Sequence, residues 1–375
     1  MMLSVTLISF FAFFSAIVVN FFANSQLANS TARPPIVVRP VNNLIFTPCF
    51  RLTCFRNLGC FEPYLIAAYI SAPPLSVCPQ NPNEMGVRFL VLASERVGGQ
   101  YDTFLSLSEI KPGTKVAFMV HGILSEYDEY IYVLPGYLLL QEYDYVIFVE
   151  WSIPADPFVF GRIPIPGLTF FLTHANVEVV GRMTANIIQK LKVERNIDPD
   201  DVRVDGFSAG GNMVEFIGQW ARFRHRIRIG KCTAIEMSGA PYFFTNKRLP
   251  HSGVCKVLDC VHATYNPKIP LLTELVAATA RFGAFESNCD SDYYVNYPFA
   301  LIDQPGCFGI YFCSHLYGLI FYSSALMKCD YRYTTCDLYS IFFSNSNRTT
   351  RLDSRDHGPL GSVCLKASNK PLSTC

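Results

Sequence analysis

The sequence predicts an α/β protein with a mostly parallel central sheet and helices on both faces. Short apolar runs alternate with longer segments whose apolar residues recur at helical spacing. A continuous apolar run is typical of a parallel strand buried on both faces, and repeated strand–helix–strand units favour a parallel sheet. The expected strands are 116–120, 145–149, 202–204 and 227–236, and the expected helices are 128–141, 176–193 and 209–223. After residue 259 we expect an irregular region rich in Cys, Tyr and Phe.

Composition narrows the class of protein. Half of the 375 residues are hydrophobic, so a large core is expected. The 31 Lys and Arg balance the 30 Asp and Glu, which gives no sign of nucleic-acid binding. Neither an internal repeat nor a separating linker follows residue 46, so residues 47–375 are expected to form a single domain.

The first residues resemble a targeting segment. Residues 1–23 carry no charge, and Ala23 and Ser25 provide small side chains around a cleavage site. We expect a signal peptide over 1–25, with an uncleaved anchor as the alternative, and a flexible lead-in over 26–46. The 14 cysteines include no CxxC pair, and sequons begin at Asn29 and Asn347. These features favour a secreted, extracellular, disulfide-stapled glycoprotein.

One pentad carries the chemistry. Residues 206–210 read Gly-Phe-Ser-Ala-Gly, directly after an expected strand and at the start of an expected helix. A G-x-S-x-G turn in that position holds a nucleophilic serine above the sheet, here Ser208, as in α/β-hydrolases. Acyl transfer also needs two N–H donors for the oxyanion. We expect them from Ala209 and from Ile123, which follows the strand 116–120, with His121 in a supporting role.

The base and the acid stay open at this point. The expected chain order is serine, acid, histidine, and five histidines follow Ser208. These are His225, His251, His262, His315 and His357. The acid is expected at Glu236, at the end of the strand after the nucleophile helix, or at Asp259 on the next one.

Several segments, in this order, resemble the animal lipase family that includes pancreatic lipases and secreted phospholipases A1. The resemblance runs from about Cys54 to the C-terminus. The matching segments are 54–60 (Cys-x5-Cys), 118–122 (Phe-Met-Val-His-Gly), 149–152 (Val-Glu-Trp-Ser), 304–307 (Gln-Pro-Gly-Cys) and 313–315 (Cys-Ser-His).

The resemblance implies specific residue roles. It makes Ser208 the nucleophile, His315 the base, and Ile123 and Ala209 the oxyanion donors. Where the family has its catalytic Asp, this chain has Glu236, which is one methylene longer. The resemblance also implies three disulfides, Cys54–Cys60, Cys307–Cys313 and Cys329–Cys336.

Three departures from the family pattern bear on which metal ions and partner proteins are expected. The Asp residues that bind calcium in some pancreatic relatives fall on Pro250 and Gly253, so no calcium is expected. Neither another metal nor a cofactor is expected. Five residues separate Cys307 from Cys313, which is too few for a long lid. The 60 residues after His315 are too few for a colipase-binding β-sandwich, so no colipase is expected.

Together these features predict a secreted serine hydrolase of lipid esters, either a triacylglycerol lipase or a phospholipase A1, acting at a lipid interface. The alternative is a catalytically weak or inactive lipid- or yolk-binding protein on the same fold. An esterase for small soluble esters is a further alternative, because a short lid permits it. Oligomeric state is left open.

Overall fold

A computed structural model describes 14 stretches of the chain. They are residues 51–65, 76–94, 104–123, 125, 130–155, 166–239, 249–264, 283–284, 287–297, 304–307, 311–337, 348–350, 352 and 359–367. The chain divides into two compact units, Met1–Asn42 and Asn43–Cys375, and every described residue belongs to the second. The expected leader, the lead-in to residue 46 and both sequon asparagines lie outside the described residues. Among the described residues, none of the helices combines the length and the apolar composition of a membrane-spanning segment.

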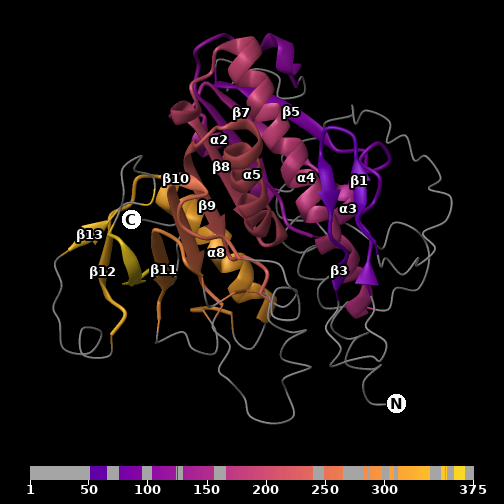
Figure 1. The fold of residues 1–375 in the computed structure, drawn as a ribbon. Helices are drawn as coiled ribbons and strands as arrows, with labels where there is room; N and C mark the ends of the chain where they lie inside the picture. Colours follow the sequence, from indigo (N-terminus) through magenta and orange to yellow (C-terminus); the bar gives the residue numbers. More distant parts are fainter. Residues whose placement is uncertain are drawn as a thin grey trace, which may run out of the picture. The chain divides into compact units, whose positions relative to one another are not determined.

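A ten-stranded sheet forms the centre of this unit (Figure 1). Its strands are β5 (Arg88–Ala93), β6 (Val116–Val120), β7 (Tyr145–Glu150), β8 (Val202–Phe207), β9 (Ile229–Ile235), β10 (Cys255–His262), β11 (Ser291–Val295), β12 (Tyr331–Thr335), β13 (Thr349–Thr350) and β14 (Gly361–Leu365). The spatial order is β13-β12-β14-β11-β10-β9-β8-β6-β7-β5. All pairings from β7 to β14 are parallel, and the antiparallel pairings are at the edges, through β5 at one end and β12 and β13 at the other.

The strand order reverses at β6. From β6 the chain first runs outward to β7 and then returns to place β8 on the other side of β6. In a parallel sheet such a reversal leaves a crevice beyond the carboxyl ends of the two central strands. Those ends are Val120 of β6, which pairs with Gly206 of β8. The pentad and the loop after β6 therefore meet at this end of the sheet.

Helices cover both faces of the sheet. The main helices are α2 (Tyr130–Leu139), α4 (Pro166–Arg195), α5 (Ala209–His225) and α8 (Tyr311–Leu326), with a short α3 (Ser152–Ala155) and 3-10 turns at Leu107–Glu109 and Pro199–Asp201. Helices α4 and α5 pack side by side (Figure 1) and share one core with alternate residues of β6, Val116, Phe118 and Val120. The residues between them, Ala117 and Met119, pack in a second core with α2 and α8. The mostly parallel sheet with helices on both faces is thus confirmed.

The expectation of irregular structure after residue 259 is wrong. This part of the chain contains the end of β10, β11, the 16-residue helix α8 and β14. Helix α8 reads YFCSHLYGLIFYSSAL and is apolar around most of its circumference. A helix buried on most sides shows no alternation of apolar and polar faces, so its period is hidden in the sequence.

A disulfide-closed hairpin packs against the helices near the start of the described chain. Strands β1 (Thr53–Phe55) and β2 (Gly59–Phe61) pair antiparallel, with the Cys54–Cys60 disulfide between them. The guanidinium of Arg182 on α4 lies between the rings of Phe61 and Trp220, 4.1 Å and 4.4 Å from their centroids. A second small ribbon, β3 (Tyr64–Leu65) and β4 (Ser76–Val77), follows.

Of the disulfides implied by the resemblance, Cys54–Cys60 and Cys307–Cys313 are present. The Cys329–Cys336 pairing is wrong, because Cys336 bonds to Cys364 instead. Strand β12 lies between Cys329 and Cys336. An extended strand rises roughly 3.3 Å per residue, so the two cysteines at its ends are too far apart to form a disulfide. The register of β12 on β14 pairs Thr334 with Cys364, which brings Cys336 to its partner. Two further disulfides, Cys232–Cys255 and Cys260–Cys289, lie along β9, β10 and the approach to β11.

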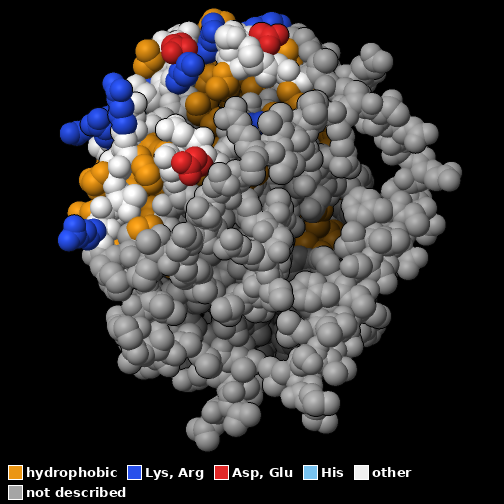
Figure 2. All heavy atoms as spheres, turned by 90° about the vertical axis from the view of Figure 1, so that its right-hand side faces the viewer, with side chains coloured by type: hydrophobic (Ala, Val, Ile, Leu, Met, Phe, Trp, Pro, Cys, Tyr) orange, Lys and Arg blue, Asp and Glu red, His pale blue; other side chains and the backbone are white. Residues whose placement is uncertain are grey.

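The described part of one face mixes charge with apolar surface. Figure 2 shows Lys and Arg side chains projecting from it, with hydrophobic side chains between them. Large hydrophobic side chains that are exposed include Phe223, near the end of α5, at 70%. The neighbouring Arg222 and Arg224 belong to the last turn of α5, where positive charge is favourable.

Candidate active site

Ser208 lies in a sharp turn between β8 and α5. The strand ends at Phe207, the helix begins at Ala209, and Ser208 itself has φ 56° and ψ −121°. A positive φ is costly for a residue with a side chain and is typical of functional sites. The two pentad glycines permit the turn. A Cβ at Gly206 would lie 2.1 Å from the Gly210 carbonyl oxygen, and one at Gly210 would lie 2.4 Å from that of Val120.

The turn places Ser208 at the positive end of a helix. The first N–H groups of α5 have no acceptor within the helix, so the N–H of Ala209 points out of its N-terminus. The Ser208 N–H donates to the carbonyl of Ile235 at 2.9 Å, which ties the turn to β9. Side-chain contact with solvent is small, since Ser208 is 5% exposed.

The loop after β6 lies against Ser208. A Cβ at Gly122 would approach the Cβ of Ser208 to 3.0 Å, so only glycine fits without a shift. The Gly122 N–H donates to the Tyr132 hydroxyl at 3.2 Å. The next N–H along the loop belongs to Ile123, which is half-buried. The loop and the start of α5 thus bring Ile123 and Ala209 to the same end of the sheet as Ser208.

His121 supports this loop and is not placed as a base. Its Nδ1 lies 2.8 Å from the Gly122 carbonyl oxygen, and its Nε2 lies 3.2 Å from the Trp151 N–H. Its ring stacks on the Trp151 indole at 5.6 Å, and the indole N–H donates to the His121 carbonyl at 3.0 Å. Both ring nitrogens are therefore engaged with backbone, which suits the expected supporting role.

Glu236 and His315 form a buried pair beside this turn. His315 Nδ1 lies 3.1 Å from Glu236 Oε2, and both side chains are buried. Because a carboxylate accepts, the proton on the ring is on Nδ1, which leaves Nε2 with its lone pair. The His315 ring also packs on Phe207, the residue before Ser208, with ring centroids 4.8 Å apart. Of the two acids left open by the sequence, Glu236 is the one that contacts His315.

The Glu236 carboxylate is held by backbone and side-chain donors at the end of β10. Oε1 accepts from the N–H groups of Ala263 and Thr264, the latter at 3.0 Å. Oε2 accepts from the Thr264 hydroxyl at 2.6 Å as well as from His315. Burial of a carboxylate is costly unless its oxygens are hydrogen-bonded, and these donors meet that need.

Asp259 has a different partner. Its Oδ2 lies 2.9 Å from Lys231 Nζ, and both side chains are buried. Lys231 Nζ also donates to the Leu352 carbonyl at 3.1 Å. Asp259 precedes the end of β10 by three residues, so it lies inside the sheet, whereas Glu236 follows the end of β9.

Ser238 is a neighbour of Ser208 that sequence reasoning missed. The two hydroxyl oxygens are 3.2 Å apart. Asn212 of α5 fixes Ser238, because its Oδ1 accepts from the Ser238 N–H at 2.9 Å and its Nδ2 donates to the Ser238 carbonyl at 3.2 Å. A polar residue shortly after β9, the strand next to the nucleophile strand, is the signal that would have found Ser238. Thr264 follows β10, which lies on the far side of β9, so it needs the wider signal of a polar residue after any neighbouring parallel strand.

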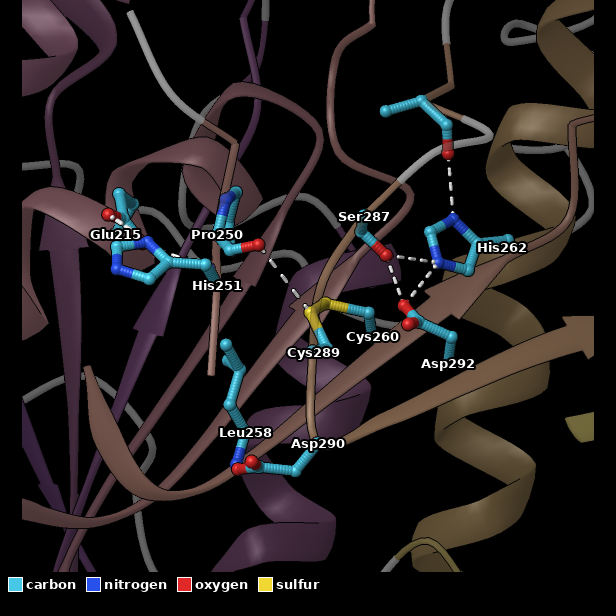
Figure 3. Close-up of a disulfide and its surroundings, with 11 residues drawn as sticks. Glu215, Pro250, His251, Leu258, Cys260, His262, Ser287, Cys289, Asp290 and Asp292 are labelled. Carbon is cyan, nitrogen blue, oxygen red and sulfur yellow. Dashed lines mark hydrogen bonds and ion pairs between the residues drawn. A yellow bond between two sulfur atoms is a disulfide. The ribbon is translucent and has the colours of Figure 1, made fainter. Parts of the chain in front are cut away.

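His262, Ser287 and Asp292 form a second Ser–His–Asp group near the end of β10 and the start of β11 (Figure 3). His262 Nε2 lies 3.0 Å from both Ser287 Oγ and Asp292 Oδ1, and Nδ1 lies 2.7 Å from the Ala284 carbonyl oxygen. The Ser287 hydroxyl itself donates to Asp292. In a catalytic relay the serine and the carboxylate bond opposite ring nitrogens. Here both lie at the same nitrogen, so the group lacks the arrangement that activates a serine.

The other candidate histidines have contacts of their own. His225 Nε2 lies 2.7 Å from Asn186 Oδ1, and burial, followed by the charge of Arg224, lowers the pKa of His225. His251 Nδ1 lies 2.7 Å from Glu215 Oε1. His357 lies outside the described residues.

Cys260, Cys289 and Asp292 are the one group of metal-ligand dimensions found among the described residues. The two cysteines form a disulfide, as Figure 3 shows, so their sulfurs are not thiolates that bind a metal.

The chain is similar in sequence to pancreatic lipases. It is 26% identical to the pancreatic triacylglycerol lipase of Cavia porcellus over 78% of this chain and 63% of that protein. It is 25% identical to the pancreatic lipase-related protein 2 of Homo sapiens over 74% of this chain and 59% of that protein. The chain thus matches less than two thirds of the length of these curated relatives. It matches no protein-family model.

Among solved structures, the chain resembles esterases loosely. An acetyl xylan esterase from Aspergillus awamori matches with a TM-score of 0.33 and 13% identity over 76% of this chain and 89% of that one. Brefeldin A esterase, a bacterial homologue of human hormone-sensitive lipase, matches with a TM-score of 0.27 and 16% identity over 46% of each chain. The fold assignment, an α/β-hydrolase, rests on the strand order and the serine turn described above.

Proposed function

We propose that the protein is a secreted serine hydrolase of carboxylic esters in lipids, with Ser208 as nucleophile, His315 as base and Glu236 as acid. One observation carries the proposal: the turn with Ser208 at positive φ lies beside the buried His315–Glu236 pair, at the carboxyl ends of β8 and β9. The similarity to pancreatic lipases supports lipid esters as the substrate class.

The first chemical step forms an acyl-enzyme. As Ser208 Oγ bonds to the ester carbonyl carbon, His315 Nε2 takes the hydroxyl proton, and the Glu236 carboxylate stabilises the resulting imidazolium. Negative charge develops on the carbonyl oxygen, and the N–H groups of Ile123 and Ala209 stabilise it. The carbon–oxygen bond to the alcohol then breaks, and His315 returns its proton to the leaving alcohol.

The second step frees the fatty acid. A water molecule attacks the acyl carbon while His315 takes one of its protons, and the same two N–H groups stabilise the oxyanion again. The bond to Ser208 Oγ breaks and Ser208 recovers its proton from His315. The products are one alcohol and one carboxylic acid, so the enzyme ends in its starting state without a cofactor.

Secretion is part of the proposal. It is supported by the disulfides, which persist in oxidising compartments, and by the apolar leader expected over residues 1–25. The Cys307–Cys313 segment, closed by its disulfide, is too short for a long lid, which is compatible with either triacylglycerol or phospholipid as the substrate.

Fatty-acid release from triacylglycerol and phosphatidylcholine emulsions tests the function. The wild-type protein is expected to release fatty acid from at least one emulsion, and Ser208→Ala is expected to release none. Ser287→Ala is a matched control, because this serine also lies beside a histidine and an aspartate, and it should keep activity. A folded wild-type protein that releases nothing from either emulsion or from a soluble short-chain ester would favour the alternative, a lipid-binding protein with a disabled triad.

A further inference from the structure

Helix α8 carries more than the base. Residues three and seven positions along a helix lie on the same face, and on α8 these positions after His315 are Gly318 and Tyr322. His315 contacts the Glu236 carboxylate, and Tyr322 reaches the buried Arg203–Asp205 pair on β8. Gly318 lies between them, on the side of the helix that faces the sheet.

Gly318 leaves room for one particular group. A Cβ at this position would lie 2.2 Å from Glu236 Cγ, 3.3 Å from its Cδ and 3.4 Å from its Cβ. These three nearest atoms all belong to Glu236. The Glu236 side chain therefore occupies the space that a side chain at residue 318 would take. An alanine there is sterically excluded unless Glu236 moves, because real Cβ atoms do not approach within 3.0 Å.

A second glycine borders the same carboxylate. A Cβ at Gly283 would lie 2.7 Å from Glu236 Oε2 and 2.9 Å from the Thr264 Cβ. Gly283 also bridges to Ser238, and the next residue, Ala284, donates its N–H to Met237. The Glu236 side chain therefore runs between a helix and a loop that both lack a Cβ at the point of contact.

We propose that Gly318 is a positioning residue for the acid, and that the Cγ methylene of Glu236 and the missing Cβ of Gly318 are a matched pair. The space at Gly318 lets the glutamate chain pass close to α8 and turn its carboxylate back to His315 Nδ1, 3.1 Å away. This inference rests on the proposed function, because it assigns Gly318 a role in the reaction through Glu236.

Helix propensity makes the pairing testable by the sign of a stability change. In a helix interior alanine is more favourable than glycine, so Gly318→Ala should stabilise the protein wherever space permits. In the wild-type background the Glu236 side chain fills that space, and Gly318→Ala should lower Tm. In a Glu236→Ala background the Cγ is absent, and the same substitution should raise Tm.

Gly181→Ala is the matched control for this cycle. Gly181 also lies inside a helix, α4, and a Cβ there would approach the Phe216 Cβ to 2.9 Å. It should lower Tm by the same amount in both backgrounds. Equal Tm losses for Gly318→Ala in the two backgrounds would overturn the matched pair. If Gly318→Ala fails to fold alone but folds together with Glu236→Ala, the pair is supported.

Activity distinguishes positioning from stability alone. A misplacement of about 1 Å in a catalytic group costs about 100-fold in rate, so Gly318→Ala should lower kcat by about that factor, with KM little changed. Gly181→Ala should keep the wild-type kcat per folded molecule. If the wild-type protein hydrolyses esters and the Gly318→Ala variant has the same kcat, the role of Gly318 is overturned and the proposed function is not. A wild-type protein without hydrolysis would overturn the proposed function, whatever the sign of the Tm changes.

Discussion

Ser208 and Glu236 directly follow the paired strands β8 and β9, and both have positive φ, 56° and 48°. A left-handed backbone is costly for residues with side chains and persists where the surroundings fix it. Here the Ser208 N–H donates to the carbonyl of Ile235, and the Glu236 N–H donates to the carbonyl of Val261 at 2.8 Å. The backbone directions of both residues at the carboxyl ends of β8 and β9 are therefore fixed. A preorganised site needs such fixed directions.

Loss of the Glu236 charge should reduce catalysis far more than folding. Glu236→Gln keeps the length of the side chain but no longer fixes the proton of His315 on Nδ1 or stabilises the imidazolium. We expect kcat on a soluble short-chain ester to fall by about 10⁴-fold, the usual cost of removing the triad acid. Steady-state kinetics beside circular dichroism would check this, and unchanged kcat would rule out Glu236 as the acid.

Asp259→Ala should show the opposite pattern. Removal of Asp259 leaves the Lys231 charge buried without its carboxylate, which costs about 3–5 kcal/mol in comparable pairs. The free energy of unfolding should fall by that amount in urea titrations, while kcat of the folded variant stays near that of the wild type. A large loss of kcat with little loss of stability would instead favour Asp259 as the acid.

Gly206→Ala should prevent folding of the serine turn. The added Cβ would lie 2.1 Å from the Gly210 carbonyl oxygen, a backbone atom that cannot rotate away. We expect a loss of more than about 4 kcal/mol, in the range reserved for severe steric or strain effects. Soluble yield and thermal unfolding measure this, and a variant with wild-type Tm would show that the turn differs from the one described.

Ser238→Ala should have a small effect on the reaction. The Ser238 hydroxyl lies 3.2 Å from Ser208 Oγ, and one neutral hydrogen bond contributes about 1 kcal/mol, or roughly fivefold in rate. We expect kcat to fall by no more than about that factor and the free energy of unfolding by no more than about 1 kcal/mol. Complete inactivation would mean that Ser238, and not only Ser208, takes a direct part in the chemistry.

A buried polar network between β8 and α8 should give stability a characteristic dependence on pH. Arg203 Nε bonds both oxygens of Asp205, and its Nη2 bonds the Tyr322 hydroxyl at 2.9 Å. Burial would lower the pKa of Arg203, but the Asp205 carboxylate raises it above its ordinary value, so Arg203 stays charged. Burial, the largest cause, raises the pKa of Tyr322 well above its ordinary value.

The sign of this effect follows from the raised pKa of Tyr322. Its contribution to stability is fully present below the unfolded pKa, about 10, and is lost as pH rises from there through the folded pKa. The free energy of unfolding should therefore decrease above about pH 10, and Tyr322→Phe should lose less over the same range. Tyr293 and Tyr331, whose pKa values burial also raises, act in the same direction in both proteins. Identical slopes for variant and wild type above pH 10 would contradict the assignment.

Local patterns predicted the elements that carry Ser208, because a continuous apolar run and a G-x-S-x-G turn can each be recognised within a few residues of sequence. Helix α5 and strands β6 to β9 lie close to their expected ranges. The hydrogen-bond partners of Glu236 could not be recognised from local sequence in the same way. Its contacts come from Ala263 and Thr264 at the end of the next strand and from His315, 79 residues away, so they depend on sheet register.

Two further features depended on distant packing. The Cys336–Cys364 disulfide follows from the antiparallel register of β12 on β14, which no local spacing reveals. The role of Gly318 depends on a side chain that approaches from β9, and in the sequence it is one more small residue in an apolar helix.

Labelling with a fluorophosphonate, which reacts with activated serines, tests the central claim most directly. The wild-type protein should take up one label per molecule on Ser208, as located by peptide mass spectrometry, and His315→Ala should react far more slowly. Absence of label on a folded wild-type protein, or label on Ser287 in place of Ser208, would contradict the claim that Ser208 is an activated nucleophile.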